Sequence, residues 1–239
     1  MTQHHAFPER TVRVIDPFGA GGGVDVIARA VAERLSAAWG QRVTVENHPG
    51  AGSTVAPALV ADAPADGYTL LINTSAHAYR AALETQRSYQ TLRDFVSVAA
   101  LTSQPYVLVA GIEGTAAGRT AYAMLPIPTA TPHIQDGGLV ALGVSTVRRS
   151  RLLPDVPPLA EAGVEGFDFP IWYGIWAPAR TPHEIVSKLA RDISNALATA
   201  ELLEWLNRHD ADPMRMTRAE FADFVDSERE RARPLLSSD

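Results

Sequence analysis

Cysteine is absent from this 239-residue sequence, which excludes disulfide bonds and thiolate metal sites. Apolar runs are short: none approaches the roughly 20 residues of a membrane-spanning helix, so we expect no membrane insertion. Long basic clusters are also missing and the net charge is −6, which argues against nucleic acid as a partner. What remains is an ordinary soluble composition, with 46% hydrophobic and 20% charged residues.

Catalytic and metal-binding patterns are missing as well. The sequence has no Gly-x-Ser-x-Gly turn, no His-Glu-x-x-His pair and no two carboxylates at a telling spacing. Ser75 and His77 are close in sequence, yet no nearby acidic residue could orient the imidazole of a nucleophile–base pair. His77 also lacks a second histidine at metal-ligand spacing. We therefore assign no catalytic residue, no metal ligand and no cofactor, and we predict that the protein is not an enzyme.

The N-terminal part of the chain alternates between strand and helix patterns. Strands are predicted over 11–15, 42–46 and 68–73, and helices over 26–40 and 56–61. In the longer helix, Ile27, Val31 and Leu35 recur at helical spacing before Gly40, and Asp25 is a candidate N-cap. Such alternation favours a parallel sheet with right-handed crossovers.

After Asp94 this alternation is lost. Further elements are predicted as strands over 96–101, 106–110 and 139–144, a small-residue loop over 112–119, an extended entry into a short helix over 154–163, and helices over 182–197, 200–208 and 217–235. The helix over 182–197 should bury one face made of Ile185, Leu189, Ile193 and Leu197. Trp172, Tyr173 and Trp176 lie in an apolar strand pattern, where core packing is commoner than ligand stacking.

Two charged segments are explained as exposed surface without a function. Arg148, Arg149 and Arg151 could form an anion-binding patch, but a solvated charge cluster at a strand end is the commoner arrangement. The mixed charges of 226–234 (DSERERARP) are typical of an exposed face of the last helix. Neither segment is taken as a functional site.

The loop PFGAGGGVD connects the first predicted strand to the first helix. In an open parallel sheet, ligands bind at this end of the strands. Glycine lets the backbone approach a ligand closely, and the N–H groups at the start of a helix favour an anion. From spacing alone, a tight strand-to-helix turn explains the same glycines equally well.

A dinucleotide site is another hypothesis for this loop. Gly19-x-Gly21, followed by a helix and a strand that ends in Glu46, imitates the dinucleotide fingerprint. Val24 stands where the third glycine would be, however, and the loop has no Walker lysine. A cytosolic Rossmann-like nucleotide-binding enzyme is therefore the weaker alternative.

The loop resembles the PFxxGGxxD motif of the tripartite tricarboxylate transporter receptors, also called Bug or TctC-type proteins. The resemblance continues through VTVENHPGAG (43–52), DGYTLLINTSAHA (66–78), LRDFVSVAAL (92–101), PHIQDGGLVALGVSTVRRSRLLPDVPPLAEAGVEGF (132–167) and WYGIWAPARTP (172–182). It implies an α/β fold of the periplasmic-binding-protein type II class, with a parallel or mixed sheet and helices on both of its faces. The first lobe would comprise 1–104, a shortened second lobe 105–167, and the return to the first lobe 168–239.

The resemblance also implies a function. A receptor of this kind is not an enzyme; it binds a small carboxylate and delivers it to a membrane permease. Ligand contacts would come from the glycine loop and from the loop after the third strand, at Phe18, Gly19, Ala20, Gly21, Gly22, Asp25, Thr74, Ser75 and His77. The family location is the periplasm, although the N-terminal residues MTQHHAFPER lack the charged and apolar regions of a signal peptide, which leaves a cytoplasmic location open.

The sequence departs from the family after Ala110. Where the family has a helix, two strands and a ligand loop, this chain has only GIEGTAAGRT (111–120), and Met124-Leu125-Pro126 replaces an acidic turn. We therefore expect the second lobe to lose most of its sheet and most of its ligand contacts. A carboxylate held by one lobe would stay hydrated and bind weakly, unless a second copy of the chain supplies the missing wall. A decayed paralogue that no longer binds is the remaining alternative.

Overall fold

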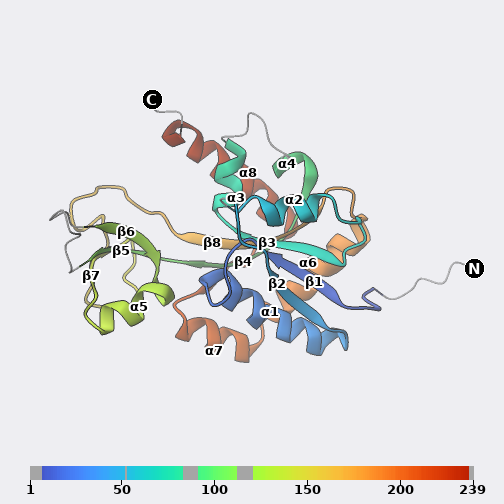
Figure 1. Cartoon of the computed structure of the whole chain (residues 1–239), viewed down its shortest axis with the longest axis horizontal. Coiled ribbons are helices and arrows are strands. Elements are labelled where there is room, and N and C mark those ends of the chain that lie inside the picture. Colours follow the sequence, from blue (N-terminus) through green and yellow to red (C-terminus); the bar gives the residue numbers. More distant parts are fainter. Residues whose placement is uncertain (1–6, 52, 83–90, 112–120, 237–239) are drawn as a thin grey trace, which may run out of the picture. The chain divides into compact units, whose positions relative to one another are not determined.

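The computed structural model describes residues 7–51, 53–82, 91–111 and 121–236. The chain folds into two compact units, whose elements are labelled in Figure 1. The first unit contains Met1–Leu101, Tyr173–Leu202 and Met214–Asp239, and the second contains Thr102–Trp172 and Leu203–Pro213. The predicted loop over 112–119 lies outside the described residues.

The first unit is built on a mixed sheet with the strand order β2-β1-β3-β8-β4. Its strands are β1 (Val12–Asp16), β2 (Val43–Asn47), β3 (Thr69–Thr74), β4 (Phe95–Gln104) and β8 (Ile171–Pro178), of which β4 and β8 run on into the second unit. β1 pairs in parallel with both β2 and β3, as the alternating pattern predicts. β8 comes from far along the chain and pairs antiparallel with β3. The strands predicted over this part of the sequence are confirmed.

Helices cover both faces of this sheet (Figure 1). They are α1 (Gly23–Trp39), α2 (Val55–Ala61), α3 (Ala76–Ala82), α4 (Thr91–Asp94), α6 (His183–Leu197), α8 (Arg218–Leu236) and the start of α7 (Ala200–Arg208). In Figure 1, α1 lies below the sheet, and α2, α3 and α8 lie above it. Every residue of β3 is buried as a result, which explains why that strand is a continuous run without polar–apolar alternation.

Of the two predictions about the ends of α1, one is confirmed and one is wrong. Gly40 terminates the helix with φ 62, and its N–H donates to the carbonyl of Ser36, as the sequence predicts. At the other end the N-cap is Gly22, so the prediction of Asp25 as the cap is wrong. Asp25 is the third helical residue, and its carboxylate reaches back to the N–H of Gly21 at 3.0 Å. The bond is similar to that of a capping box, in which an acidic residue in the first helical turn accepts an N–H group from a residue just before the helix.

The long helices bury the faces that their periodicity predicts, with small exceptions. α6 buries Leu189, Ile193 and Leu197, whereas Ile185 is only half-buried. In α8 the predicted exposed face over 226–234 is interrupted, because Glu228 and Ala232 are buried. Among the described helices, none combines the length and apolarity needed to cross a bilayer.

Aromatic side chains fill the core between β8 and α8. Trp172 and Tyr173 are fully buried and Trp176 is 2% exposed, which confirms core packing for this segment. The ring of Trp176 lies 5.4 Å from the ring of Phe221. Gly174 leaves room for both, since a Cβ at that position would lie 2.8 Å from Trp176 Cη2 and would overlap Phe221 Cζ.

Replacing Gly174 by alanine is expected to lower the free energy of unfolding by about 2 kcal/mol, because the added methyl group overpacks the core. Shortening the opposing ring by Phe221→Leu should recover part of this loss, so the double variant should lose less than the two single losses added together. Urea unfolding of the four proteins measures the coupling. Strictly additive losses would show that the two positions do not clash.

The second unit has its own small sheet and hydrophobic core. The sheet order is β6-β5-β7, all antiparallel, with β5 (Tyr106–Gly111), β6 (Tyr122–Pro126), β7 (Leu139–Val144) and one covering helix, α5 (Ile127–Gln135). The core consists of Val107, Val109, Ile127, Ala130 and Val144. A short strand, β9 (Asp212–Pro213), pairs with the end of β4. A three-stranded sheet with its own core is therefore present in this unit.

Two predictions for this unit are wrong. Residues 154–163 form a series of turns and no helix; Pro158 makes a single bridge with Val144. β6 and α5 were not predicted, and Met124, Leu125 and Pro126 end a strand there in place of a turn. α5 carries Pro132 inside it and a proline in its first turn, and a sequence pattern with such residues normally argues against a helix.

Candidate functional site

The glycine loop lies at the carboxyl end of β1, as the sequence predicts. Gly19, Ala20 and Gly21 are exposed, and Gly21 has φ 80, a conformation that glycine adopts without strain. Two of the loop N–H groups are held internally: that of Phe18 donates to Asp16 Oδ1 at 2.8 Å, and that of Gly21 donates to Asp25. Among the described residues, the N–H groups of Gly19 and Ala20 have no partner. The loop therefore presents exposed donors at a helix N-terminus, which suits an anion.

A network of polar side chains, in which Asp16 and Asp25 are buried and Asn47 is half-buried, holds this loop in place. The side-chain amide of Asn47, at the end of β2, donates to Asp16 Oδ2 at 3.0 Å, to Asp25 Oδ1 at 3.0 Å and to the carbonyl of Phe18 at 3.2 Å. Arg29, one turn further along α1, donates through Nε to Asp25 at 3.0 Å and through Nη2 to Asn47 Oδ1 at 3.1 Å. One amide thus ties two strand ends to the first turn of the helix.

Asp16, Asn47 and Arg29 were not predicted as parts of the site. A signal was present, because Asp16 and Asn47 each end a predicted strand, and the carboxyl ends of neighbouring parallel strands lie at one edge of a sheet. The register places Asp16 directly opposite Asn47. Asp25 was predicted as a ligand contact or an N-cap; it is not the N-cap, and its carboxylate supports the loop through its bond to Gly21.

The two carboxyl groups of this network have opposite pKa shifts. Asp16 is fully buried, and burial raises its pKa to about 7, with the neighbouring Asp25 charge adding to the rise. Burial also acts to raise the pKa of Asp25, but hydrogen bonds from Arg29, Gly21 and Asn47 outweigh it and hold that pKa below its usual value. Separate environments thus keep one carboxyl group largely protonated up to neutral pH while its neighbour is charged.

The segment after β3 meets the glycine loop at the same edge of the sheet, because β1 and β3 are parallel neighbours. Thr74 and Ser75 are nonetheless buried, at 5% and 2% exposure. The hydroxyl of Thr74 accepts the N–H of Ala76 at 3.1 Å, and the hydroxyl of Ser75 bonds to that of Tyr79. Both side chains stabilise the start of α3. Because they are buried, a ligand at this edge would have to approach the chain very closely to contact them.

His77 does not lie in a polar loop as predicted; it belongs to α3 and is 1% exposed. Its ring centroid lies 4.5 Å from that of Trp176 and 5.2 Å from that of Phe95. Nδ1 lies 3.3 Å from the amide nitrogen of Asn73, and Nε2 is buried without a partner. Burial lowers the pKa of His77 to about 3, helped by the charge of Arg80, so the imidazole is neutral at physiological pH.

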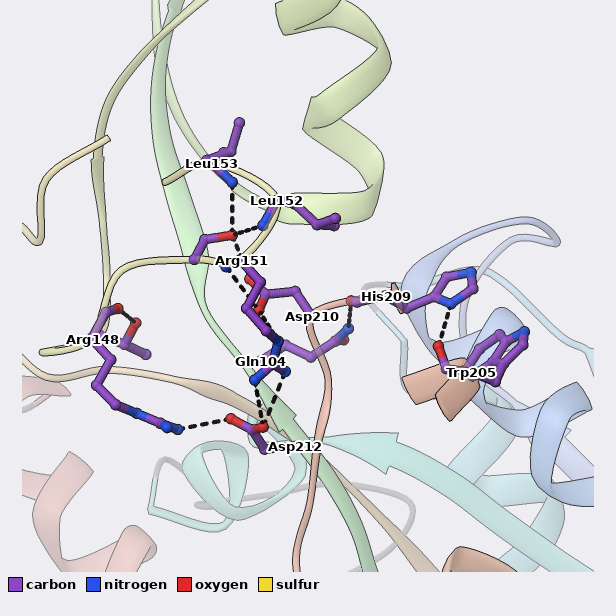
Figure 2. Close-up of polar contacts among 11 residues, drawn as sticks. Gln104, Arg148, Arg151, Leu152, Leu153, Trp205, His209, Asp210 and Asp212 are labelled. Atoms are coloured by element: carbon purple, nitrogen blue, oxygen red, sulfur yellow. Dashed lines mark hydrogen bonds and ion pairs between the residues drawn. The ribbon is translucent and has the colours of Figure 1, made fainter. Parts of the chain in front are cut away.

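In the second unit, the arginines that follow β7 are not merely solvated. Figure 2 shows Arg148 and Arg151 converging on Asp212: Arg148 Nη2 lies 2.8 Å from Oδ2, and Arg151 Nη1 and Nη2 each lie 3.0 Å from Oδ1. Arg149 pairs with Glu161 at 2.7 Å. All three arginines remain exposed, with side-chain exposures of 77% for Arg148, 43% for Arg149 and 38% for Arg151, so the predicted solvated cluster also carries ion pairs.

Asp210 forms the buried half of the same cluster. Its Oδ2 accepts the hydroxyl of Ser150, and its Oδ1 lies 3.2 Å from both the N–H and the Nε of Arg151. Gln104 lies beside it, and its side-chain amide donates to the carbonyl of His209 at 2.9 Å (Figure 2). A hollow of about 280 Å³ borders the cluster. Since every carboxylate shown here already has a cationic partner, we assign the cluster to holding the segment 209–213 against the loop 146–151.

Comparison with known proteins identifies the family. The model described as "Tripartite tricarboxylate transporter family receptor" matches residues 27–123 and 110–238. The chain belongs to this family. It is a family of solute-binding receptors and not of enzymes, which decides against the dinucleotide-binding enzyme as an explanation of the glycine loop.

Several relatives align with nearly the whole of this chain. A UPF0065 protein from the tcbD-tcbE intergenic region of Pseudomonas sp. strain P51 is 31% identical, with 97% of this chain and 87% of that protein covered. Protein BugT of Bordetella pertussis is 28% identical, with 94% and 88% covered. MatC from Rhodopseudomonas palustris, solved with bound malate, has a TM-score of 0.88 at 27% identity, with 97% and 100% covered. Another R. palustris protein, solved with adipate, has a TM-score of 0.86 at 25% identity, with 94% and 95% covered.

The alignments also show how many positions of its relatives this chain lacks. The match to the Pseudomonas protein runs over 292 positions, whereas 97% of 239 residues is about 232, so about 60 aligned positions have no residue here. The match to BugT, over 286 positions and 94% of the chain, leaves a gap of the same size. Both segments matched by the family model include 110–123. These findings support the expected gap after Ala110.

Proposed function

We propose that this receptor binds a small dicarboxylate at its glycine loop and serves a tripartite permease from the periplasm. The observation that carries the proposal is that the exposed residues Gly19 and Ala20, next to the N-terminus of α1, have N–H groups without a partner among the described residues. MatC and its R. palustris relative were solved with malate and adipate, which makes dicarboxylates the first ligands to test.

The nine predicted positions would differ in their roles. Gly19 and Ala20 would contact the carboxylate through their N–H groups, with Phe18, Gly21 and Gly22 shaping the loop. Asp25 would hold the loop in place, since its carboxylate is already bonded to Gly21 and Arg29. Thr74, Ser75 and His77 would support the adjacent edge of the sheet, because all three are buried.

The affinity should be low. With about 60 family positions missing near the second sheet, a ligand would keep much of its hydration, and hydration weakens its bonds to N–H groups. We expect a millimolar dissociation constant for malate or adipate, equivalent to about −4 kcal/mol.

An NMR titration of the purified chain with malate and adipate tests the proposal. The amide signals of Gly19 and Ala20 should shift with millimolar saturation. Ala20→Asp should weaken binding at least tenfold, because it places a negative charge at the anion site, whereas the uncharged isostere Ala20→Asn should bind as the wild type does. A loop that responds to no carboxylate would favour a decayed, non-binding paralogue, and undiminished binding by Ala20→Asp would place the ligand elsewhere.

A further inference from the structure

The sheet of the second unit has one covered face and one open face. α5 covers the face that carries Val107, Val109 and Val144. On the opposite face, the described residues of the three strands include no charged side chain, and six apolar residues lie together there: Leu108, Ala110, Tyr122, Met124, Val140 and Leu142. We call these six residues the open face.

Exposure on the open face is high for apolar side chains. Tyr122 is 65% exposed, Val140 44%, Met124 38% and Leu142 37%. The register brings them together, since Ala110 lies opposite both Tyr122 and Val140. At one end of the sheet the face is closed, because Leu159 packs over Gly143, where a Cβ would lie 3.0 Å from Leu159 Cγ. An apolar surface of this kind, continuous across three strands, is typical of an interaction site.

The family segment that this chain lacks falls next to the open face. The gap of about 60 positions falls within 110–123, between the end of β5 and the start of β6. Ala110 and Tyr122, which lie opposite each other at this end of β5 and β6, both belong to the open face.

We propose that two copies of this chain associate through the open face, sheet against sheet, about a twofold axis. Such an axis places a surface against itself, so a charged surface would repel its own copy, whereas the open face carries no charge. Two sheet faces can pack about 10 Å apart with interdigitated apolar side chains. The contact is small, so the dimer should be weak, with a micromolar dissociation constant. This inference does not depend on carboxylate binding.

Sedimentation analysis of the purified chain over about 1–500 µM tests the dimer, a range that brackets a micromolar constant. We expect a reversible monomer–dimer equilibrium that Val140→Glu weakens at least tenfold. Val164→Glu is the matched control, since Val164 is 48% exposed but lies off the sheet, and it should leave the equilibrium unchanged. A monomer throughout, open-ended association, or equal effects of the two variants would each overturn the proposal.

A second measurement avoids the introduced charge. Because the chain has no cysteine, Leu142→Cys and Val164→Cys each provide a single thiol for maleimide labelling. Raising the protein concentration should slow labelling at position 142 at least threefold and leave the rate at position 164 unchanged. Equal rates at position 142 across the dimerisation range would show that the open face stays uncovered and would overturn the proposal.

Discussion

Replacing Asp210 by alanine is expected to lower the free energy of unfolding by about 3 kcal/mol, because three donors lose a buried acceptor at once. Asp210 is 4% exposed, and it accepts the Ser150 hydroxyl, the Arg151 N–H and the Arg151 guanidinium. Its backbone has φ 53, which an alanine adopts at a further cost of about 1 kcal/mol. Amide hydrogen exchange in β5 under increasing urea reports on this unit directly.

Two companion variants separate the contributions. Asp212→Ala removes a carboxylate that pairs with the same Arg151 but is 41% exposed, so it should cost no more than about 1 kcal/mol. Asp210→Gly removes the same bonds as the alanine variant while relieving the backbone, so its loss should be smaller than that of Asp210→Ala. Equal losses for Asp210→Ala and Asp212→Ala would contradict the idea that burial gives Asp210 its role.

The elements that could be predicted from the sequence share strong local signals. The α1 helix combined a regular apolar stripe with Gly40 as a left-handed terminator, and β-branched runs marked β1 and β2. α5 gave no such signal, because Pro132 lies inside it and packing against Val107 and Val109 overrides its poor propensity. The position of α5 over the sheet of the second unit therefore depends on tertiary contacts, which leave no periodic pattern in the sequence.

The same contrast applies to the polar residues. The position of the glycine loop followed from the strand-to-helix transition, but the role of Asp25 depended on Asn47, which arrives from the next strand. Ser150 and Asp210 are 60 residues apart, and nothing in either local sequence indicates their bond. His77 occurs in a polar stretch of sequence, yet the aromatic rings of Phe95 and Trp176 enclose it. The burial of His77 depends on packing partners that are distant in the sequence, so the residues next to it in the sequence do not predict it.

Titration of Asp16 should make the first unit less stable as the pH rises from about 4 to about 7. The pKa of this buried carboxyl group is raised to about 7, against an unfolded value of about 3.9, so in this window the folded chain retains a proton that the unfolded chain has lost. The contribution of Asp16 to stability is therefore complete below the pKa of the unfolded chain. It is lost as the pH rises to the pKa of the folded chain. The slope is about 1.4 kcal/mol per pH unit, or about 4 kcal/mol over the window.

Asp16→Asn should abolish this decline, because the amide keeps the shape of the side chain and cannot ionise. Asp25→Asn is the contrasting variant. The charge of Asp25 helps to raise the pKa of Asp16, so its removal should move the end of the declining limb to lower pH without abolishing it. Urea unfolding between pH 4 and pH 8 distinguishes the two outcomes. If the wild-type stability is flat in this range, Asp16 is ionised in the folded chain, and the network beneath the glycine loop carries two negative charges stabilised by Arg29 and Asn47.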